Sequence, residues 1–413
     1  MRATTLLSKT LQLNKTRILA VDFDADGLVV DVAPSTRIPR CSECFCRVRQ
    51  VYDRRERRWR HLDAGAMRVE LRYELKRVDC PRCGVVVELV PWAEKGSWFT
   101  YEFEDTTAYL LQAQNNSAVA TTMRISWPTV GTIARRVVDR VMDADALDGL
   151  TVIGIDELSY RRHHEYVTVV VDHLRHRVVW ASRGKSAATV KQFFDELGPE
   201  RAAKIEVVTI DMSPAYIKAV SDGAPNARIV FDRFHVQRLA QDALDEVRRH
   251  QIRSIEDPVD RRAIKGTRFA LLKSPWNLTD IEGRKLAEVQ RTNKKLYRAY
   301  LLKETLAAVL DRRQVNVART KLREWIQWAS RSRLKPFAKL ARTIKKHTEG
   351  ILGYVQTHLS NGIVEGLNGK IRTLTRRAYG FHSATSLIGL IFLCCSGITL
   401  QPVHKRPVLP HNL

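Results

Sequence analysis

One carboxylate stands apart near the C-terminal end of the chain. From Arg331 to Phe381 the sequence holds eleven lysines and arginines but only two acids, Glu349 and Glu365. Glu365 lies in the segment SNGIVEGLNGKIRTLTRRAYGF, residues 360–381. A carboxylate is well placed in so basic a region if it binds a cation. Glu365 is therefore a candidate metal ligand.

Two aspartates each follow an apolar run that has the pattern of a buried strand. Asp156 follows VIGI, and Asp211 follows VVTI. If the two strands are parallel neighbours, both carboxylates emerge at one edge of the sheet, where their repulsion favours a cation between them. Glu365, on a helix packed against that edge, would complete a hard-oxygen site for two divalent ions. An aspartate at a strand end is also a common turn former or helix cap, so each signal alone is weak.

The helix that carries Glu365 is predicted to have two distinct faces. Its apolar residues recur at helical spacing and predict a buried stripe: Ile363, Val364, Leu367, Ile371, Leu374 and Ala378. Another face carries Glu365, Asn368, Arg372 and Arg376 at spacings of three and four. We expect this helix to bind DNA phosphates through Asn368, Lys370, Arg372 and Arg376.

The elements that must position these acids follow the order of a ribonuclease-H-like mixed sheet. Between 149 and 236 the periodicity predicts three strands, a helix, a strand, a helix and a fifth strand. Residues 237–347 are helical and basic, and we interpret them as an insertion because the acidic motif resumes only after them. The sequence thus predicts a multidomain α/β protein with a catalytic core split by a large helical insertion.

Five of the seven cysteines lie near the N-terminus. Two CxxC pairs, Cys41 with Cys44 and Cys80 with Cys83, flank β-patterned sequence. This spacing is typical of a four-thiolate structural zinc ribbon. Cys46 is a spare thiol that could replace Cys44 as a ligand. Free thiols without a disulfide pattern indicate a reducing compartment.

Residues 103–142 have helical periodicity and predict a helix-turn-helix. The longer helix starts with WPTVG after a Ser126 cap, and its apolar residues give it one buried face. The outward residues would then contact DNA as a recognition helix does: Thr129, Thr132, Arg135 and Arg136. Similar helix patterns also occur in bundles that do not bind DNA.

Composition agrees with a nucleic-acid partner. The 413 residues carry a formal net charge of +24 and are 44% hydrophobic, which indicates a globular chain that binds a phosphate backbone. The longest apolar run, residues 386–400, is too short to span a bilayer and predicts a buried helix. The N-terminus lacks the apolar region of a secretory signal.

Several of these motifs together resemble the DDE transposases of bacterial insertion sequences, in particular the ISL-three family. The resemblance rests on GIDE, TIDMSPAY, FDRFH, LLKSPWNLTD and the segment 360–381, and it covers nearly the whole chain. It implies that Asp156, Asp211 and Glu365 are the catalytic acids and hold two magnesium ions, with manganese as a substitute. Cys46 departs from the family pattern.

The same resemblance implies a function and its partners. Such a transposase binds terminal inverted repeats, cleaves DNA and joins the freed ends to target DNA, acting as a homodimer on double-stranded DNA in the bacterial cytoplasm at the nucleoid. Zinc would be structural, and no membrane is involved. Two alternatives remain: a ribonuclease-H-like nuclease without strand transfer, and an inactive zinc-containing DNA-binding regulator.

Two further groups of residues are candidates for functional roles, but a structural explanation fits each of them about as well. Asp232 and His235 in FDRFH resemble an auxiliary pair near the sheet edge, although a purely structural pair explains them nearly as well. Arg161, Arg162, His163 and His164 form a basic turn that either contacts phosphate or is simply solvated.

The predicted domains follow these signals. They are a β-rich zinc ribbon domain, a helix-turn-helix domain, the first part of the core, the insertion, the second part of the core with the Glu365 helix, and a tail: 1–98, 99–148, 149–236, 237–347, 348–400 and 401–413.

Overall fold

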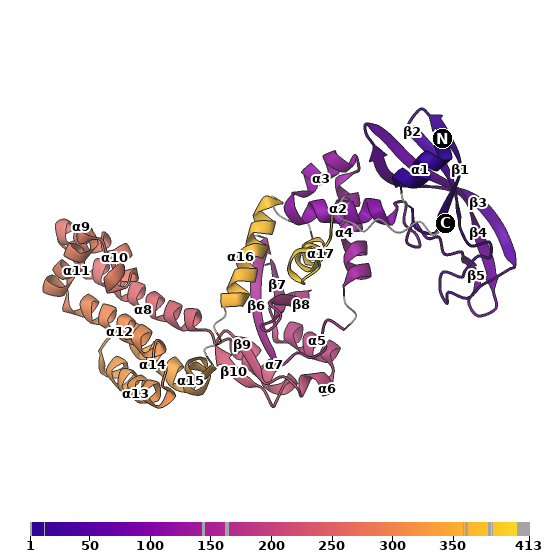
Figure 1. Cartoon of the computed structure of the whole chain (residues 1–413). Coiled ribbons are helices and arrows are strands. Elements are labelled where there is room, and N and C mark those ends of the chain that lie inside the picture. The colour runs from indigo at the N-terminus through magenta and orange to yellow at the C-terminus, as the bar shows by residue number, and fades with distance from the viewer. Residues whose placement is uncertain are drawn as a thin grey trace. The chain divides into compact units, whose positions relative to one another are not determined.

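The computed structural model divides the chain into two compact units. One consists of Met1–Met142 with Gly389–Leu413, and the other of Asp143–Ile388 (Figure 1). The structure describes residues 2–11, 13–142, 145–161, 165–357, 359, 362–378, 381 and 383–402, with only the backbone of Asp260. Most of the predicted tail, 401–413, lies outside these residues.

The first unit contains a five-stranded sheet with helix α1 (Ala3–Leu11) beside its first strand. The strands are paired in the order β1-β2-β4-β3, and β5 pairs with β4. Apolar and polar residues alternate along these strands, so one face of the sheet is buried around Trp59 and Leu71. The ring of Trp92 packs edge-on against that of Trp59, with the ring centroids 5.6 Å apart. The strands are β1 (Thr16–Asp24), β2 (Gly27–Pro34), β3 (Val51–Ala64), β4 (Met67–Cys80) and β5 (Gly84–Val87).

Three helices follow in the segment that predicted a helix-turn-helix: α2 (Tyr101–Ala113), α3 (Asn116–Met123) and α4 (Trp127–Val141). The side chain of Thr100 caps α2, and that of Asn115 caps α3. Arg124 ends α3 in the left-handed conformation, with φ 53°, which makes the turn into α4. The predicted apolar helix is α17 (Ala384–Cys395); Gln112 of α2 donates hydrogen bonds to the carbonyls of Leu393 and Ile398.

The second unit contains the mixed sheet that the sequence predicted, in the order β10-β9-β6-β7-β8. β6, β7 and β8 are antiparallel neighbours, whereas β9 is parallel to both β6 and β10. The elements are β6 (Val152–Arg161), β7 (Glu165–Asp172), β8 (Arg177–Arg183), α5 (Ala187–Leu197), α6 (Pro199–Ala202), β9 (Val207–Ile210), α7 (Pro214–Gly223) and β10 (Arg228–Phe231).

A run of helices then separates β10 from the Glu365 helix. The first begins at once after β10, because Asp232 is its N-cap. These helices bury a common core that includes Tyr300, Trp325 and Phe337. They are α8 (Arg233–Ser254), α9 (Pro258–Lys265), α10 (Arg268–Leu272), η1 (Pro275–Asn277), α11 (Asp280–Thr292), α12 (Lys294–Leu310), α13 (Val315–Arg331), α14 (Lys335–Lys346) and α15 (Thr348–Thr357).

Helix α16 (Gly362–Arg377) returns to the sheet and packs on β6 (Figure 1). The contact depends on Gly154 in the middle of β6. A Cβ there would lie 2.5 Å from Cγ2 of Val364 and 2.8 Å from Nε2 of His173. The missing side chain therefore lets α16 approach the strand that carries Asp156.

Among the described residues, no helix is both long and apolar enough to cross a membrane.

Candidate functional site

Three aspartates come level with one another across three parallel strands. The register pairs Gly154 with Thr209 and Phe231 with Ile210, so Asp156, Asp211 and Asp232 come level across the three strands. Asp211 and Asp232 directly follow the last residues of β9 and β10. Asp156 instead lies in the middle of β6, which continues to Arg161, so the expected strand end at Asp156 is corrected. The predicted parallel neighbours are thus β6 and β9. The carboxylate of Asp211 accepts a hydrogen bond from the amide of Ser213 at 2.9 Å, and that of Asp156 from the amide of Glu157 at 2.8 Å.

Glu365 faces this edge from α16. Its side chain is exposed in the first turn, three residues before Asn368. Partial burial raises its pKa, and the carboxylates of Asp232 and Asp156 raise that pKa further. Glu365 therefore lies within the electrostatic field of two of the three aspartates.

Asp156, Glu157 and Glu365 have raised pKa values, first because of burial and then because of neighbouring carboxylates. Burial raises the pKa of Asp156, and the neighbouring carboxylates of Asp211 and Asp232 raise it further. Burial together with Asp211 and Asp156 raises the pKa of Glu157 to about 7. His235 opposes these shifts in Asp156, Glu157 and Glu365. A divalent cation would relieve the same repulsion.

Glu157 follows Asp156 in β6, where strand alternation would turn it to the other face of the sheet. The structure places it close enough to Asp211 to feel that charge. Asp232 is 1% exposed, and His235 Nε2 lies 3.8 Å from its Oδ2. Asp232 and His235 therefore both border the acids, as the FDRFH motif suggested.

The donor set suits a hard divalent ion, although the carboxylates are not drawn together. Asn368 is 1% exposed, and its Nδ2 donates a 2.6 Å hydrogen bond to Oδ2 of Asp156. Its Oδ1 is buried and meets no donor among the described residues, so an oxygen is left next to the acids. Within those residues, only four cysteines form a group of three or more metal-ligand side chains within 4.8 Å of one another. Asp156, Asp211 and Glu365 are more widely spaced.

Two of the residues that were predicted to contact DNA from α16 do not lie on the face that carries Glu365. Asn368 does not face outward: the buried side of α16 consists of Val364, Asn368, Ile371 and Leu374. Arg372 and Arg376 are exposed beside Glu365, as expected. Lys370 is exposed too, but helical geometry turns it away from that face.

The zinc ligands predicted from the two CxxC pairs come together. The sulfurs of Cys41, Cys44, Cys80 and Cys83 all lie within 4.8 Å of one another. Cys46 is a neighbour outside that group, with its Sγ 3.2 Å from Cys44 and 3.5 Å from Cys80. Hydrogen bonds from Cys46 lower the pKa of the Cys44 thiol to about 6, which favours the thiolate that binds a metal.

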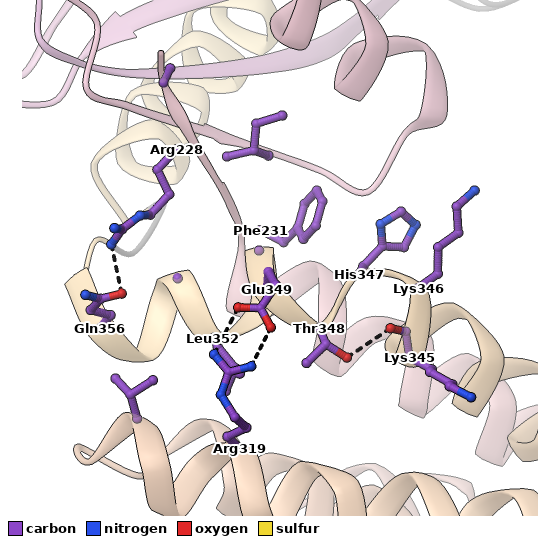
Figure 2. Close-up of a pocket in the computed structure, with 15 residues that line it drawn as sticks. Arg228, Phe231, Arg319, Lys345, Lys346, His347, Thr348, Glu349, Leu352 and Gln356 are labelled. Atoms are coloured by element: carbon purple, nitrogen blue, oxygen red, sulfur yellow. Dashed lines mark hydrogen bonds and ion pairs between the residues drawn. The ribbon is translucent and has the colours of Figure 1, made fainter. Parts of the chain in front are cut away.

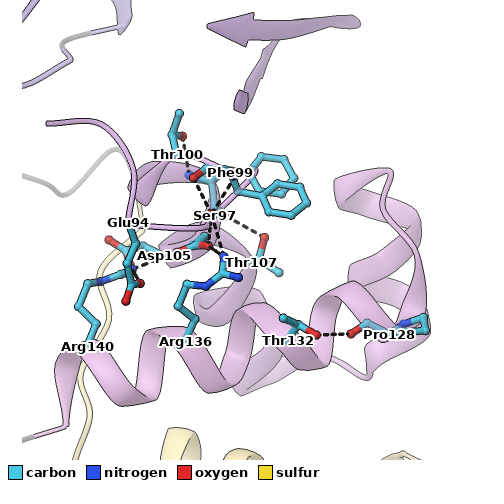
Figure 3. A network of polar contacts seen from close by, with 12 residues as sticks. Glu94, Ser97, Phe99, Thr100, Asp105, Thr107, Pro128, Thr132, Arg136 and Arg140 are labelled. Carbon is cyan, nitrogen blue, oxygen red and sulfur yellow. Dashed lines mark hydrogen bonds and ion pairs between the residues drawn. The ribbon is translucent and has the colours of Figure 1, made fainter. Parts of the chain in front are cut away.

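The longer helix of the predicted helix-turn-helix is held by a buried acid. Glu104 of α2 is fully buried and pairs with Arg136 and Arg140 of α4, and Ser97 donates to it at 2.7 Å (Figure 3). Arg136 is therefore committed to this network, and its predicted role as a DNA contact is corrected.

The other predicted contacts of α4 differ in exposure. Thr132 and Arg135 are exposed, and Thr129 is half-buried beside Ser126. The stem of Arg135 packs close to Gly389, where an added Cβ would lie 3.1 Å from Arg135 Cγ.

Parts of two predicted motifs lie outside the described residues. They are 162–164 of the basic turn, and 360–361 and 379–380 of the Glu365 segment.

Three family models match successive parts of the chain. Residues 37–83 match the zinc-finger of the transposases IS204, IS1001, IS1096 and IS1165, and 88–138 match the helix-turn-helix domain of transposase family ISL3. Residues 153–391, which include the three aspartates and α16, match a model described as a transposase.

Curated relatives align with this chain over most or all of its length. The chain is 39% identical over 447 aligned residues to the transposase for insertion sequence element IS1557 from two strains of Mycobacterium tuberculosis, covering 100% of this chain and 99% of the relative. It is 31% identical to the transposase for IS1001 from Bordetella parapertussis, over 86% and 88% of the two chains. With the cysteine cluster, the three-helix segment and the three aspartates each inside a matching model, the chain belongs to the ISL3 family of insertion-sequence transposases.

Proposed function

We propose that this transposase binds the terminal inverted repeats of its element and catalyses metal-dependent DNA cleavage and strand transfer by a DDE mechanism. One observation carries the proposal: Asp156, within β6, comes level with Asp211, which follows the parallel neighbour β9, and the helix with Glu365 docks beside them. The strand order β8-β7-β6-β9-β10 supports a ribonuclease-H-like core, with α8 to α14 as its insertion.

Each acid has a distinct task in this mechanism. Asp156 and Asp211 would hold the cations from the sheet, and Glu365 would hold them from α16. Magnesium, or manganese in its place, would activate the attacking water or 3′-hydroxyl and stabilise the leaving oxygen when bound. Asn368 orients Asp156 through the 2.6 Å hydrogen bond. His235, with Nε2 3.8 Å from Oδ2 of Asp232, stands beside the acids and would offset their charge in its protonated form.

DNA would be held by exposed cations on separate elements. Arg372 and Arg376 stand on the same helix as Glu365 and would bind phosphates next to the cleaved bond. Thr132 and Arg135 of α4 remain candidates for reading the terminal repeat. Cutting both ends of an element together requires two active sites, so we propose a homodimer on double-stranded DNA, in the cytoplasm at the nucleoid.

The test is an assay with end-labelled DNA carrying the element's terminal repeats, target plasmid and Mg²⁺. We expect cut ends and joined products from the wild type, and neither from Asp211→Asn, which should still bind DNA. Cut ends without joined products would support a nuclease instead. Equal product patterns from wild type and Asp211→Asn would overturn the proposed site, because an inactive DNA-binding regulator predicts that result.

A further inference from the structure

Helix α14 carries an unusual stripe of positive charge. Its twelve residues, KPFAKLARTIKK, include no acid. Lys335, Lys339, Arg342 and Lys346 follow one another at spacings of four, three and four, and all four are exposed. Such spacing places them on one side of a helix. The opposite side packs into the core: Phe337, Leu340, Ala341 and Ile344.

The stripe differs from neighbouring helix surfaces in its lack of counter-charges. On α13, Arg319 pairs with Glu349, and Lys321 pairs with Glu324 at 2.8 Å. No acid among the described residues forms an ion pair with any of the four cations of the α14 stripe. Like charges at these spacings repel and weaken a helix, so a bound polyanion would relieve a real strain on α14.

A basic cavity lies at the N-terminal end of α14. It has a volume of about 510 Å³ and lies between α8, the start of α12 and the connection from α13. Arg253, Lys295, Arg333 and Lys335 line it, whereas Glu246 is its one acidic lining residue. Arg333 adopts a left-handed conformation, with φ 59°, at the connection that joins the cavity to the stripe.

A second basic cavity, of about 600 Å³, lies at the other end of α14. Lys345 and Lys346 line one end of it, away from Arg228 and Gln356 (Figure 2). Glu349, its acidic lining residue, is already paired with Arg319. The cavity also borders β10, the edge strand of the sheet that carries the acids.

We propose that the α14 stripe and its two flanking cavities form a binding track for the phosphate backbone of double-stranded DNA, separate from the helix-turn-helix and from α16. From Lys335 to Lys346 the helix rises about 16 Å, which matches the axial rise of about five base pairs of duplex DNA. Lysine and arginine side chains without acids suit a backbone contact that positions DNA without reading its sequence. This inference rests on the proposed function, because it assigns that function's DNA a further contact.

The test compares two variants of the full chain that lose the same charge. The stripe variant is Lys339→Gln, Arg342→Gln, Lys346→Gln. The control is Lys191→Gln, Arg291→Gln, Lys321→Gln, which removes three exposed cations that pair with acids on their own helices. Glutamine keeps helix propensity, and melting curves would verify that both variants are folded. The probe is a labelled random-sequence duplex several turns long, titrated between about 50 and 200 mM salt.

We expect the stripe variant to bind this duplex about tenfold or more weakly, and the slope of log K against log salt to fall by about 2 to 3. The control should change the slope by less than about 1. Equal slopes in the two variants would overturn the track. A different result would overturn the proposed function: a wild-type protein that neither binds nor cleaves DNA. If the wild type cleaves DNA but the two variants bind the duplex equally well, only the binding track is ruled out.

Discussion

The cysteine cluster and the acidic site are two candidate metal sites built in different ways. The four sulfurs of the zinc ribbon lie within 4.8 Å of one another, whereas Asp156, Asp211 and Glu365 do not gather to that distance. Within the cysteine cluster the hydrogen bonds of Cys46 stabilise the Cys44 thiolate, whereas ionised carboxylates repel until a cation lies between them. The cysteine cluster thus has the geometry of a structural zinc site, and the wider spacing of the acids is what the proposed function expects of a site that also admits substrate.

The largest effect should follow the loss of a zinc ligand. Cys80→Ser should reduce bound zinc from about one ion per chain to nearly none and should unfold the ribbon, since structural zinc in finger peptides supplies about 10 kcal/mol or more. Metal analysis together with hydrogen exchange of β3 to β5 measures this. Cys46→Ser is the matched control and should retain zinc, because its sulfur lies outside the group of four. Zinc loss in Cys46→Ser alone would reassign the ligands.

At the acidic site, in contrast, loss of a ligand should abolish activity but not stability. Asp156→Asn should lower cleavage by about a thousandfold or more, because a metal-binding acid is lost. Its melting temperature without added divalent metal should equal or exceed that of the wild type, since the substitution removes a repelling charge. A strongly destabilised Asp156→Asn would show that the acid is structural, as the cysteines are.

The sequence predicted the elements of both sites but not all of their contacts. Period-two and period-3.6 hydrophobicity predicted β6 to β10 and α16, and CxxC spacing predicted the cysteine cluster. Asn368 was misplaced because it lies at the border of two helix faces, and its hydrogen bond to Asp156 is made on the buried side of α16. The pairing of Arg136 with Glu104 joins residues 32 positions apart, which local spacing does not reveal.

Asn368 tests whether the open site depends on a preorganised acid. Asn368→Ala should lower the free energy of unfolding by about 1 to 3 kcal/mol, because it removes a buried partner of Asp156. Cleavage should fall by about tenfold to a hundredfold, and more Mg²⁺ should restore part of it if Asp156 is only misoriented. Arg376→Gln, on the exposed side of α16, is the control and should weaken DNA binding without a comparable loss of stability.

The smallest effect concerns protons at the open site. Glu157 has a pKa raised to about 7, so without divalent metal the folded chain holds a proton that the unfolded chain releases near pH 4.5. The unfolding free energy should therefore fall as pH rises through this window, because the folded state binds more protons than the unfolded state. Added Mg²⁺ should oppose the fall, since a cation stabilises the ionised carboxylates.

Melting curves at several pH values, with and without Mg²⁺ and without a chelator that would strip zinc, measure this effect. The difference between wild type and Glu157→Gln isolates the one carboxyl from the many other titrating groups. That difference should be largest in metal-free buffer and shrink with Mg²⁺. If the difference in unfolding free energy is independent of pH between about 4.5 and 7, the raised pKa of Glu157 does not contribute to stability. If Glu157→Gln changes the zinc content, the substitution also affects the zinc ribbon, and the two sites are not independent.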